Sequence, residues 1–204
     1  MKLALGTAQF GMHYGISNKH QPIAEEEAAK ILLLCKKFSV DTIDTASSYG
    51  DSEKILGACR LEDFKVNTKL KLLPESCKNV FLWVEQEIKQ SLDNLKIDAL
   101  NTIYIHHPSD LIGPHGKDLH MALSSFKKEG LFLNLGISIY APDELSYLLE
   151  SYNFDIIQIQ KIRLKFISVS PEYKCFEALS FSGRSLFEMI GEEWGSEVEI
   201  EQPH

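Results

Sequence analysis

The sequence predicts an α/β fold of the (β/α)8 TIM-barrel type, incomplete, with about six recognisable β/α units in 204 residues. Short apolar segments alternate with longer amphipathic ones, which indicates parallel strands joined by helical crossovers. Polar side chains stand at the ends of successive predicted strands, where barrels carry their sites. A doubly wound open sheet is the alternative. It is disfavoured because residues 6–11, after the first predicted strand, lack the GxGxxG spacing of that fold.

The elements are expected in strand–helix order. The helix at 25–38 follows the strand at 3–5, because Ala28, Ile31, Leu32 and Cys35 recur on one helical face. The long helix at 78–95 shows the same helical spacing, and Pro142 marks the start of the helix at 142–151. The other expected strands are 40–43, 64–68, 101–105, 133–137 and 156–159, and the other expected helices are 52–60 and 119–128.

The alternation decays after residue 159, although a complete barrel needs about 250 residues. The sequence therefore predicts a barrel portion at 1–159 and a divergent C-terminal segment at 160–204, whose acidic tail at 192–201 is expected to stay mobile. Six strands do not close an eight-stranded barrel, so the first and sixth are expected to keep open edges. Open edges favour self-association with another chain.

The composition is that of an ordinary globular protein, with 44% hydrophobic and 25% charged residues. A net charge of −8 argues against nucleic acid as a partner, because phosphate contacts need clustered Lys and Arg. Four scattered cysteines without a CxxC pair indicate reduced thiols. No apolar run is long enough to span a membrane, and no signal peptide is recognisable, so a cytoplasmic location is expected.

Four polar residues at predicted strand ends are the candidate catalytic group: Asp44, Tyr49, Lys69 and His106. In a barrel these ends surround one mouth, so the side chains are expected to converge. A phenol has an ordinary pKa near 10, and an ammonium group close by favours the phenolate and lowers that pKa. Lys69 would supply the ammonium, Asp44 would hold it, and His106 would donate to a carbonyl oxygen. Such a group suits proton transfer to an oxygen that becomes negative.

Each of these residues also has a structural interpretation, because Asp and Tyr are common in turns and Lys is common at solvated strand ends. His106 and His107 are adjacent, and adjacent strand residues point to opposite sides. A shared metal site is therefore not expected, and a metal-dependent barrel hydrolase using His106 and Asp44 lacks a second ligand pair.

Taken together, these motifs resemble the aldo-keto reductase family, NADP-dependent (β/α)8 barrel oxidoreductases, over residues 3–159. The most specific part is the segment 44–57, with Asp44, Tyr49, Glu53 and Gly57. It is supported, in the family's order, by residues 5–11, Thr68-Lys69, residues 103–108, residues 135–138 and residues 156–158.

The resemblance implies NADPH-dependent reduction of an aldehyde or ketone, with a small carbonyl or alcohol compound as substrate. Tyr49 would be the general acid, Lys69 and Asp44 would tune its pKa, and His106 would orient the carbonyl. The cofactor-binding residues implied are Gly6, Thr7, Asp44, Ser138 and Gln158. His107 occupies a position that is often held by an aromatic or apolar side chain in the family, so it is expected to help shape the substrate pocket. Ile139 stands where many members have Asn.

The resemblance weakens beyond residue 159. Residues 184–187 are only faintly similar to a seventh-strand motif, and the acidic end does not resemble the family's Lys-Ser and Arg-rich pocket for the adenosine phosphates. Two hypotheses therefore stay open: a working reductase, and a catalytically impaired remnant or binding protein without the adenosine-phosphate site.

Overall fold

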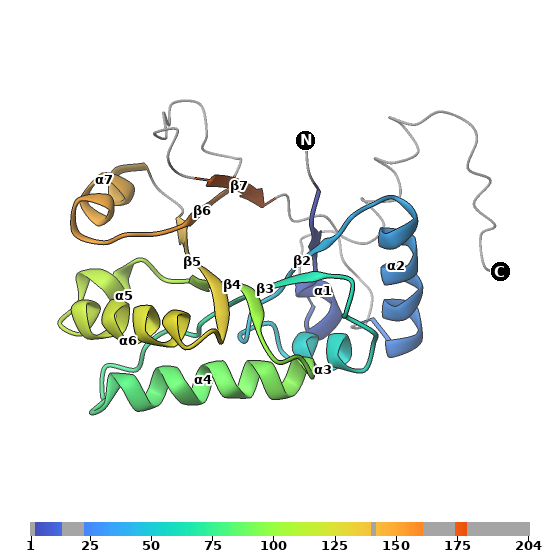
Figure 1. The fold of residues 1–204 in the computed structure, drawn as a ribbon, viewed down its shortest axis with the longest axis horizontal. Helices are drawn as coiled ribbons and strands as arrows, with labels where there is room; N and C mark the ends of the chain where they lie inside the picture. The colour runs from blue at the N-terminus through green and yellow to red at the C-terminus, as the bar shows by residue number, and fades with distance from the viewer. Residues whose placement is uncertain (1–2, 14–22, 140–141, 161–173, 179–204) are drawn as a thin grey trace.

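The computed structural model of the protein describes residues 3–13, 23–139, 142–160 and 174–178 (Figure 1). The strands are β1 (Leu5–Gly6), β2 (Thr42–Asp44), β3 (Lys65–Lys69), β4 (Leu100–Ile105), β5 (Phe132–Ile139), β6 (Ile156–Gln160) and β7 (Lys174–Ala178). The helices are α1 (Ala8–Gly11), α2 (Glu25–Lys37), α3 (Ser52–Gly57), α4 (Val80–Leu95), α5 (Ser109–Ile112), α6 (Gly116–Lys128) and α7 (Pro142–Ser151).

The seven strands form one sheet in which all neighbours are parallel and the spatial order follows the chain order. Parallel neighbours need crossover connections, and between β1 and β6 the helices supply them. In Figure 1 the strands lie at the centre, with α2 on one side, α4 below and α6 on the other side. This order is that of a (β/α)8 barrel, and the described strands form an open part of one. The predicted fold class is confirmed.

One strand was not expected from the sequence. β7 pairs with β6 over five register positions, from Ile156 opposite Lys174 to Gln160 opposite Ala178. The expectation that the sixth strand keeps an unpaired edge is therefore wrong. Within the described residues, β1 and β7 are the strands with a single neighbour. Residues 184–187 and the acidic end lie outside the described residues.

The sheet separates an apolar layer from a polar one. Strand residues that face the helices join the hydrophobic core, among them Ile43, Val66, Ile103 and Ile137. The alternate residues of the same strands point to the other face, because side chains alternate along a strand. Many of those are polar and buried: Asp44, Asn67, Lys69, Thr102, Ser138 and Gln158. Burying polar groups costs free energy unless they are paired. This face of the sheet is therefore the candidate location of a functional site.

Element boundaries differ from expectation where caps decide them. α4 begins at Val80 because the Asn79 side chain accepts a hydrogen bond from the Leu82 N–H at 3.1 Å, which makes Asn79 the N-cap. α6 begins at Gly116, ahead of the expected residue 119. The four-residue helices α1 and α5 were not expected, since one turn carries no measurable hydrophobic period.

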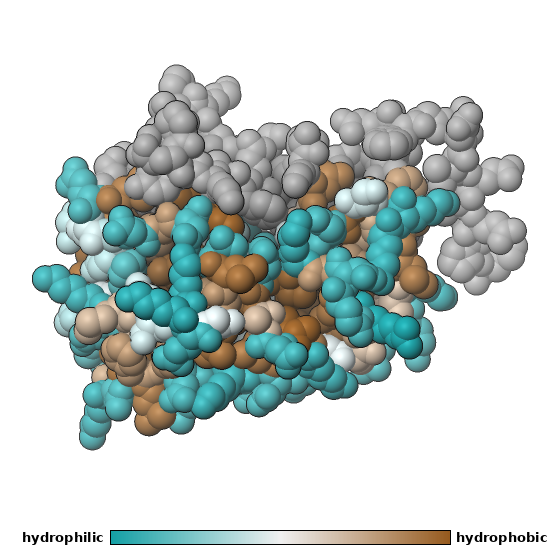
Figure 2. Space-filling view, in the orientation of Figure 1, coloured by the Kyte–Doolittle hydropathy of each residue, from teal (hydrophilic) through white to brown (hydrophobic). Residues whose placement is uncertain are grey.

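The surface is mixed in character. Figure 2 shows hydrophilic residues around the rim of one face and hydrophobic residues gathered near its centre. Several large apolar side chains of the described part are exposed: Leu33, Leu72, Phe81, Leu82, Ile112, Met121, Leu133 and Tyr147. They come from different segments along the chain, and scattered exposure of this kind is ordinary for a globular fold.

Candidate functional site

The candidate residues lie at the carboxyl ends of neighbouring strands. Asp44 is the last residue of β2, Lys69 the last of β3, and His106 follows β4 directly. Barrel sites are built at this end of the sheet. The register also places Gly6 opposite Asp44 and Ser138 opposite Gln158.

A buried ion pair forms the centre of the site. Lys69 Nζ donates to Asp44 Oδ2 at 2.6 Å and to the Thr45 carbonyl oxygen at 2.9 Å. The side chains of Lys69 and Asp44 are only 3% and 12% exposed. Gln158 Nε2 donates to the other carboxylate oxygen, Asp44 Oδ1, at 3.2 Å. Burying two charges is tolerable when they are close and further hydrogen bonds satisfy them, as here.

Tyr49 lies against this pair, and His106 lies against Tyr49. Lys69 Nζ lies 5.3 Å from the centroid of the Tyr49 ring. The rings of Tyr49 and His106 meet edge to face, with their centroids 6.1 Å apart. The structure therefore brings together all four predicted catalytic residues: Asp44, Tyr49, Lys69 and His106.

Two glycines fix the loop that carries Tyr49. A Cβ atom on Gly11 would overlap the Tyr49 carbonyl oxygen, and one on Gly50 would overlap the Gly11 carbonyl oxygen. Gly50 also has a φ of 58°, in the left-handed region where glycine has no Cβ penalty. The end of α1 and the Tyr49 loop thus pack backbone against backbone.

Thr7 supports the loop from inside. Its hydroxyl donates to the Asp44 carbonyl oxygen at 3.1 Å and accepts from Ser52 Oγ at 3.0 Å. Ser52 Oγ also lies 3.0 Å from Thr45 Oγ1. Thr7 is fully buried, so its observed contacts position Asp44 and the start of α3. Its role toward a cofactor stays a prediction.

Several polar atoms around the ion pair have no hydrogen-bond partner within the described ranges. They are Gln158 Oε1, His106 Nδ1 and the Tyr104 hydroxyl. Gln158 and Ser138 are 2% and 5% exposed and lie side by side on β6 and β5. A buried carbonyl oxygen such as Gln158 Oε1 fits an N–H donor of a bound molecule, because leaving it unpaired costs about 1–3 kcal/mol.

The two adjacent histidines do not point to opposite sides as expected. Their ring centroids are 4.9 Å apart and the rings are tilted by 40°. The expectation is wrong because β4 ends at Ile105, so the strand alternation no longer holds at His106 and His107. Among the residues that the structure describes, no three His, Cys, Asp or Glu side chains gather as metal ligands.

His106 is expected to make the protein less stable in mild acid. Burial, with the charges of Lys69 and His107, lowers the pKa of His106 from its ordinary value of 6.5 to about 4. Between these values the unfolded chain binds more protons, so stability falls as the pH drops through this window. His106→Asn should show a shallower fall in the urea midpoint from pH 7 to pH 4.5.

The control for this experiment is His13→Asn, since His13 is an exposed residue after α1. It should reproduce the wild-type pH dependence. Equal slopes for wild type and His106→Asn would mean that His106 does not resist protonation. At pH 7 the low pKa keeps His106 neutral, which suits a hydrogen-bond donor to a carbonyl better than a proton source.

Sequence reasoning missed one residue of this cluster. Tyr104 is not among the predicted site residues, yet its ring centroid lies 5.9 Å from Lys69 Nζ. The signal that could have revealed it is the strand period, because Tyr104 follows Ile103 on β4 and Ile103 faces the helices. The strand register agrees with this contact, because Tyr104 of β4 lies opposite Lys69 of β3.

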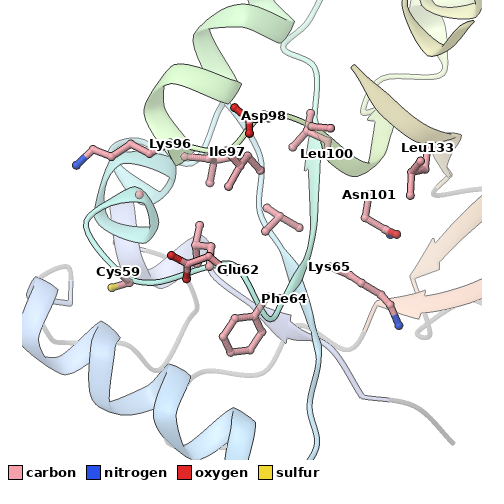
Figure 3. Close-up of a pocket in the computed structure, with 15 residues that line it drawn as sticks. Cys59, Glu62, Phe64, Lys65, Lys96, Ile97, Asp98, Leu100, Asn101 and Leu133 are labelled. Atoms are coloured by element: carbon pink, nitrogen blue, oxygen red, sulfur yellow. The ribbon is translucent and has the colours of Figure 1, made fainter. Parts of the chain in front are cut away.

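A hollow of about 640 Å³ lies away from this site (Figure 3). Its lining includes Phe64, Lys65 and Asn101, which stand where β3 and β4 begin. The candidate catalytic residues stand where these strands end. The hollow therefore lies toward the amino ends of the strands, where conserved barrel features serve stability more often than chemistry.

None of the helices that the structure describes combines the length and apolar character that a membrane crossing requires.

Comparisons with known proteins agree with this geometry. The sequence model described as "Aldo/keto reductase family" matches residues 2–192. An aldo-keto reductase of Mycolicibacterium paratuberculosis is 26% identical over 136 residues, which cover 64% of this chain and 46% of that protein. The chain thus spans about half the length of this curated relative.

Two solved structures share the fold. A Pseudomonas aeruginosa protein assigned to the aldo-keto reductases matches with a TM-score of 0.64 and 24% identity, over 77% of this chain and 62% of its own. A Bombyx mori aldo-keto reductase in complex with NADP matches with a TM-score of 0.57 and 20% identity, over 78% and 53%. At these identities the two structures support the barrel alone. With the family model matching most of the sequence, the chain belongs to the aldo/keto reductase family.

Proposed function

We propose that the protein is an NADPH-dependent oxidoreductase that reduces an aldehyde or ketone to an alcohol. The observation that carries this proposal is the buried Lys69–Asp44 pair, 2.6 Å long, with the Tyr49 ring against Lys69 and His106 against the Tyr49 ring. Membership of the aldo/keto reductase family supports an oxidoreductase of this type. NADPH is proposed from the family and from the NADP in the Bombyx mori relative.

Each of the four residues would have its own role in the reaction. Bound NADPH would supply a hydride to the carbonyl carbon. The Tyr49 hydroxyl would give its proton to the carbonyl oxygen, which gains the electron pair of the broken C=O π bond. Lys69, held by Asp44, would stabilise the phenolate left on Tyr49. His106, neutral at pH 7, would donate a hydrogen bond to the same oxygen and fix its position.

The chain also offers groups that fit the nicotinamide end of the cofactor. Gln158 Oε1 has no partner in the described part of the chain and would accept from a carboxamide N–H. Ser138 lies opposite Gln158 and would contact the same group. Gly6, opposite Asp44, has no side chain to obstruct an approach to the backbone. Thr7 would act by holding Asp44.

We also propose where the protein is located and which partners it has. The net charge of −8 supports a chain without nucleic-acid partners, and its scattered cysteines support a cytoplasmic location. Self-association is proposed through the edges of β1 and β7, each of which has one neighbour among the described strands. The division at residue 159 stays a prediction.

NADPH titration of the full chain tests the cofactor. Fluorescence of the bound nicotinamide is expected to saturate within the 1 μM to 1 mM range that is usual for enzymes. Gln158→Leu should weaken binding by about 2- to 10-fold, the value of one lost hydrogen bond. The matched control is Gln90→Leu, on the exposed face of α4, which should bind as the wild type does.

Absence of binding at hundreds of micromolar would overturn the reductase proposal for this chain. It would favour the alternative, a non-catalytic remnant that retains the catalytic residues without the cofactor. Saturable binding that Gln158→Leu leaves unchanged would keep the cofactor but reject this placement of its nicotinamide.

A further inference from the structure

The Lys69 ammonium lies between two aromatic rings. Its distance to the ring centroid is 5.3 Å for Tyr49 and 5.9 Å for Tyr104. Both are within the roughly 6 Å at which a cation is attracted by the face of a ring. Of the three hydrogens on Nζ, two are used by Asp44 Oδ2 and the Thr45 carbonyl oxygen. The rings therefore complete the surroundings of the buried charge.

The two rings differ in their environment. Tyr49 is partly exposed at the mouth of the site, whereas Tyr104 is fully buried. Burial raises the pKa of the Tyr104 phenol well above its ordinary value, and the charge of Asp44 raises it further. Tyr104 therefore stays a neutral ring next to Lys69. The field of the ammonium acts on one phenol that faces the mouth, Tyr49.

The position of the Tyr104 ring depends on the neighbouring strand. A Cβ atom on Gly136 of β5 would overlap Cδ1 and Cε1 of Tyr104. The register places Gly136 directly opposite Tyr104. The ring thus lies against bare backbone on one side and near Lys69 on the other. Any side chain at position 136 would displace the ring from this position.

The Tyr104 hydroxyl makes no hydrogen bond to the part of the chain that the structure describes, although the residue is 0% exposed. An unpaired buried hydroxyl opposes folding. What Tyr104 contributes to the site is therefore its ring.

We propose that Tyr104 is a positioning residue, whose ring, seated on Gly136, shields the Lys69 ammonium from water and holds it beside Tyr49. The inference deepens the proposed reductase function and rests on it for its catalytic meaning. The packing itself can be tested without any turnover.

The test is the rate at which an acetylating reagent modifies Lys69, followed by mass spectrometry of its peptide in the intact folded chain. The rate is divided by that of Lys54, whose side chain is 66% exposed. Tyr104→Phe keeps the ring and should leave this ratio within about twofold. Tyr104→Leu removes the ring and should raise it by about 2- to 30-fold, as expected for the loss of a cation–π contact. Gly136→Ala displaces the ring and should raise the ratio in the same direction.

Ile103→Ala is the matched control, because Ile103 is also buried on β4 but belongs to the hydrophobic core on the helix side. It should lower stability and leave the Lys69 ratio unchanged. If Tyr104→Leu does not fold, Gly136→Ala carries the comparison. An unchanged ratio in the folded ring-loss variant would overturn the proposal, and so would an equal rise in Tyr104→Phe.

The outcome of this test does not depend on whether the proposed reductase function is correct. A chain that fails to bind NADPH can still show the ring effect on Lys69, and a chain that binds NADPH can fail to show it. Where turnover is measured, Tyr104→Leu should shift the pH profile of kcat/KM and Tyr104→Phe should not. A role in packing alone would lower the stability of Tyr104→Leu without shifting this pH profile.

Discussion

Tyr49→Phe is expected to lower kcat for carbonyl reduction by about 10²–10⁴-fold in a preparation that turns over with NADPH. The substitution removes the hydroxyl that gives the proton. It keeps the ring that lies 5.3 Å from Lys69 Nζ and against His106. The Kd for NADPH should therefore stay within about twofold of the wild-type value, and the loss should appear in single-turnover rates as well as in kcat.

A matched control is Tyr147→Phe, which removes a hydroxyl from a side chain 55% exposed on α7. It should leave both kcat and NADPH binding unchanged. Retained turnover in Tyr49→Phe would mean that the proton comes from another group. His106 would then be the next candidate, and its low pKa of about 4 predicts that activity from this source rises as the pH falls.

The fold could be predicted wherever a segment carried its own pattern. α2 and α4 have apolar residues at helical spacing, and both lie within a few residues of the expected ranges. β7 could not be found in this way, because Lys174, Cys175 and Glu177 show no alternation between apolar and polar side chains. Its strand state depends on pairing with β6, and such pairing is a tertiary effect that local propensity does not contain.

The part of the site that consists of residues at the ends of single strands could be predicted from the sequence. Asp44, Lys69 and His106 each end or follow a strand, so a barrel brings them together without further information. The contact of the Tyr104 ring with Gly136 could not be predicted, because it depends on the register between β4 and β5. The two histidines were misjudged for a related reason. The hydrogen bonds of β4 decide where this strand ends. Side chains alternate only within the strand, so the alternation does not extend to the residues that follow it.

Asp44→Ala is expected to lower the free energy of unfolding by about 3–5 kcal/mol, the cost of leaving a buried charge without its partner. Lys69 is 3% exposed and would keep only the Thr45 carbonyl oxygen as an acceptor. Urea unfolding with linear extrapolation measures the change. Adding Lys69→Met to Asp44→Ala should recover much of the loss, because the double variant buries no unpaired charge. It should nevertheless stay inactive, since it lacks both groups proposed to act on Tyr49.

The exposed pair of Lys36 and Asp63 provides the comparison. Its two atoms, Lys36 Nζ and Asp63 Oδ2, are 2.7 Å apart, close to the spacing in the buried pair, but the side chains are 36% and 71% exposed. Asp63→Ala should lower the free energy of unfolding far less than Asp44→Ala does, because water solvates the lysine that remains. Equal costs for Asp44→Ala and Asp63→Ala would show that water reaches Lys69 freely. The ammonium would then be screened from Tyr49, and the argument that Lys69 stabilises the phenolate would lose its physical basis.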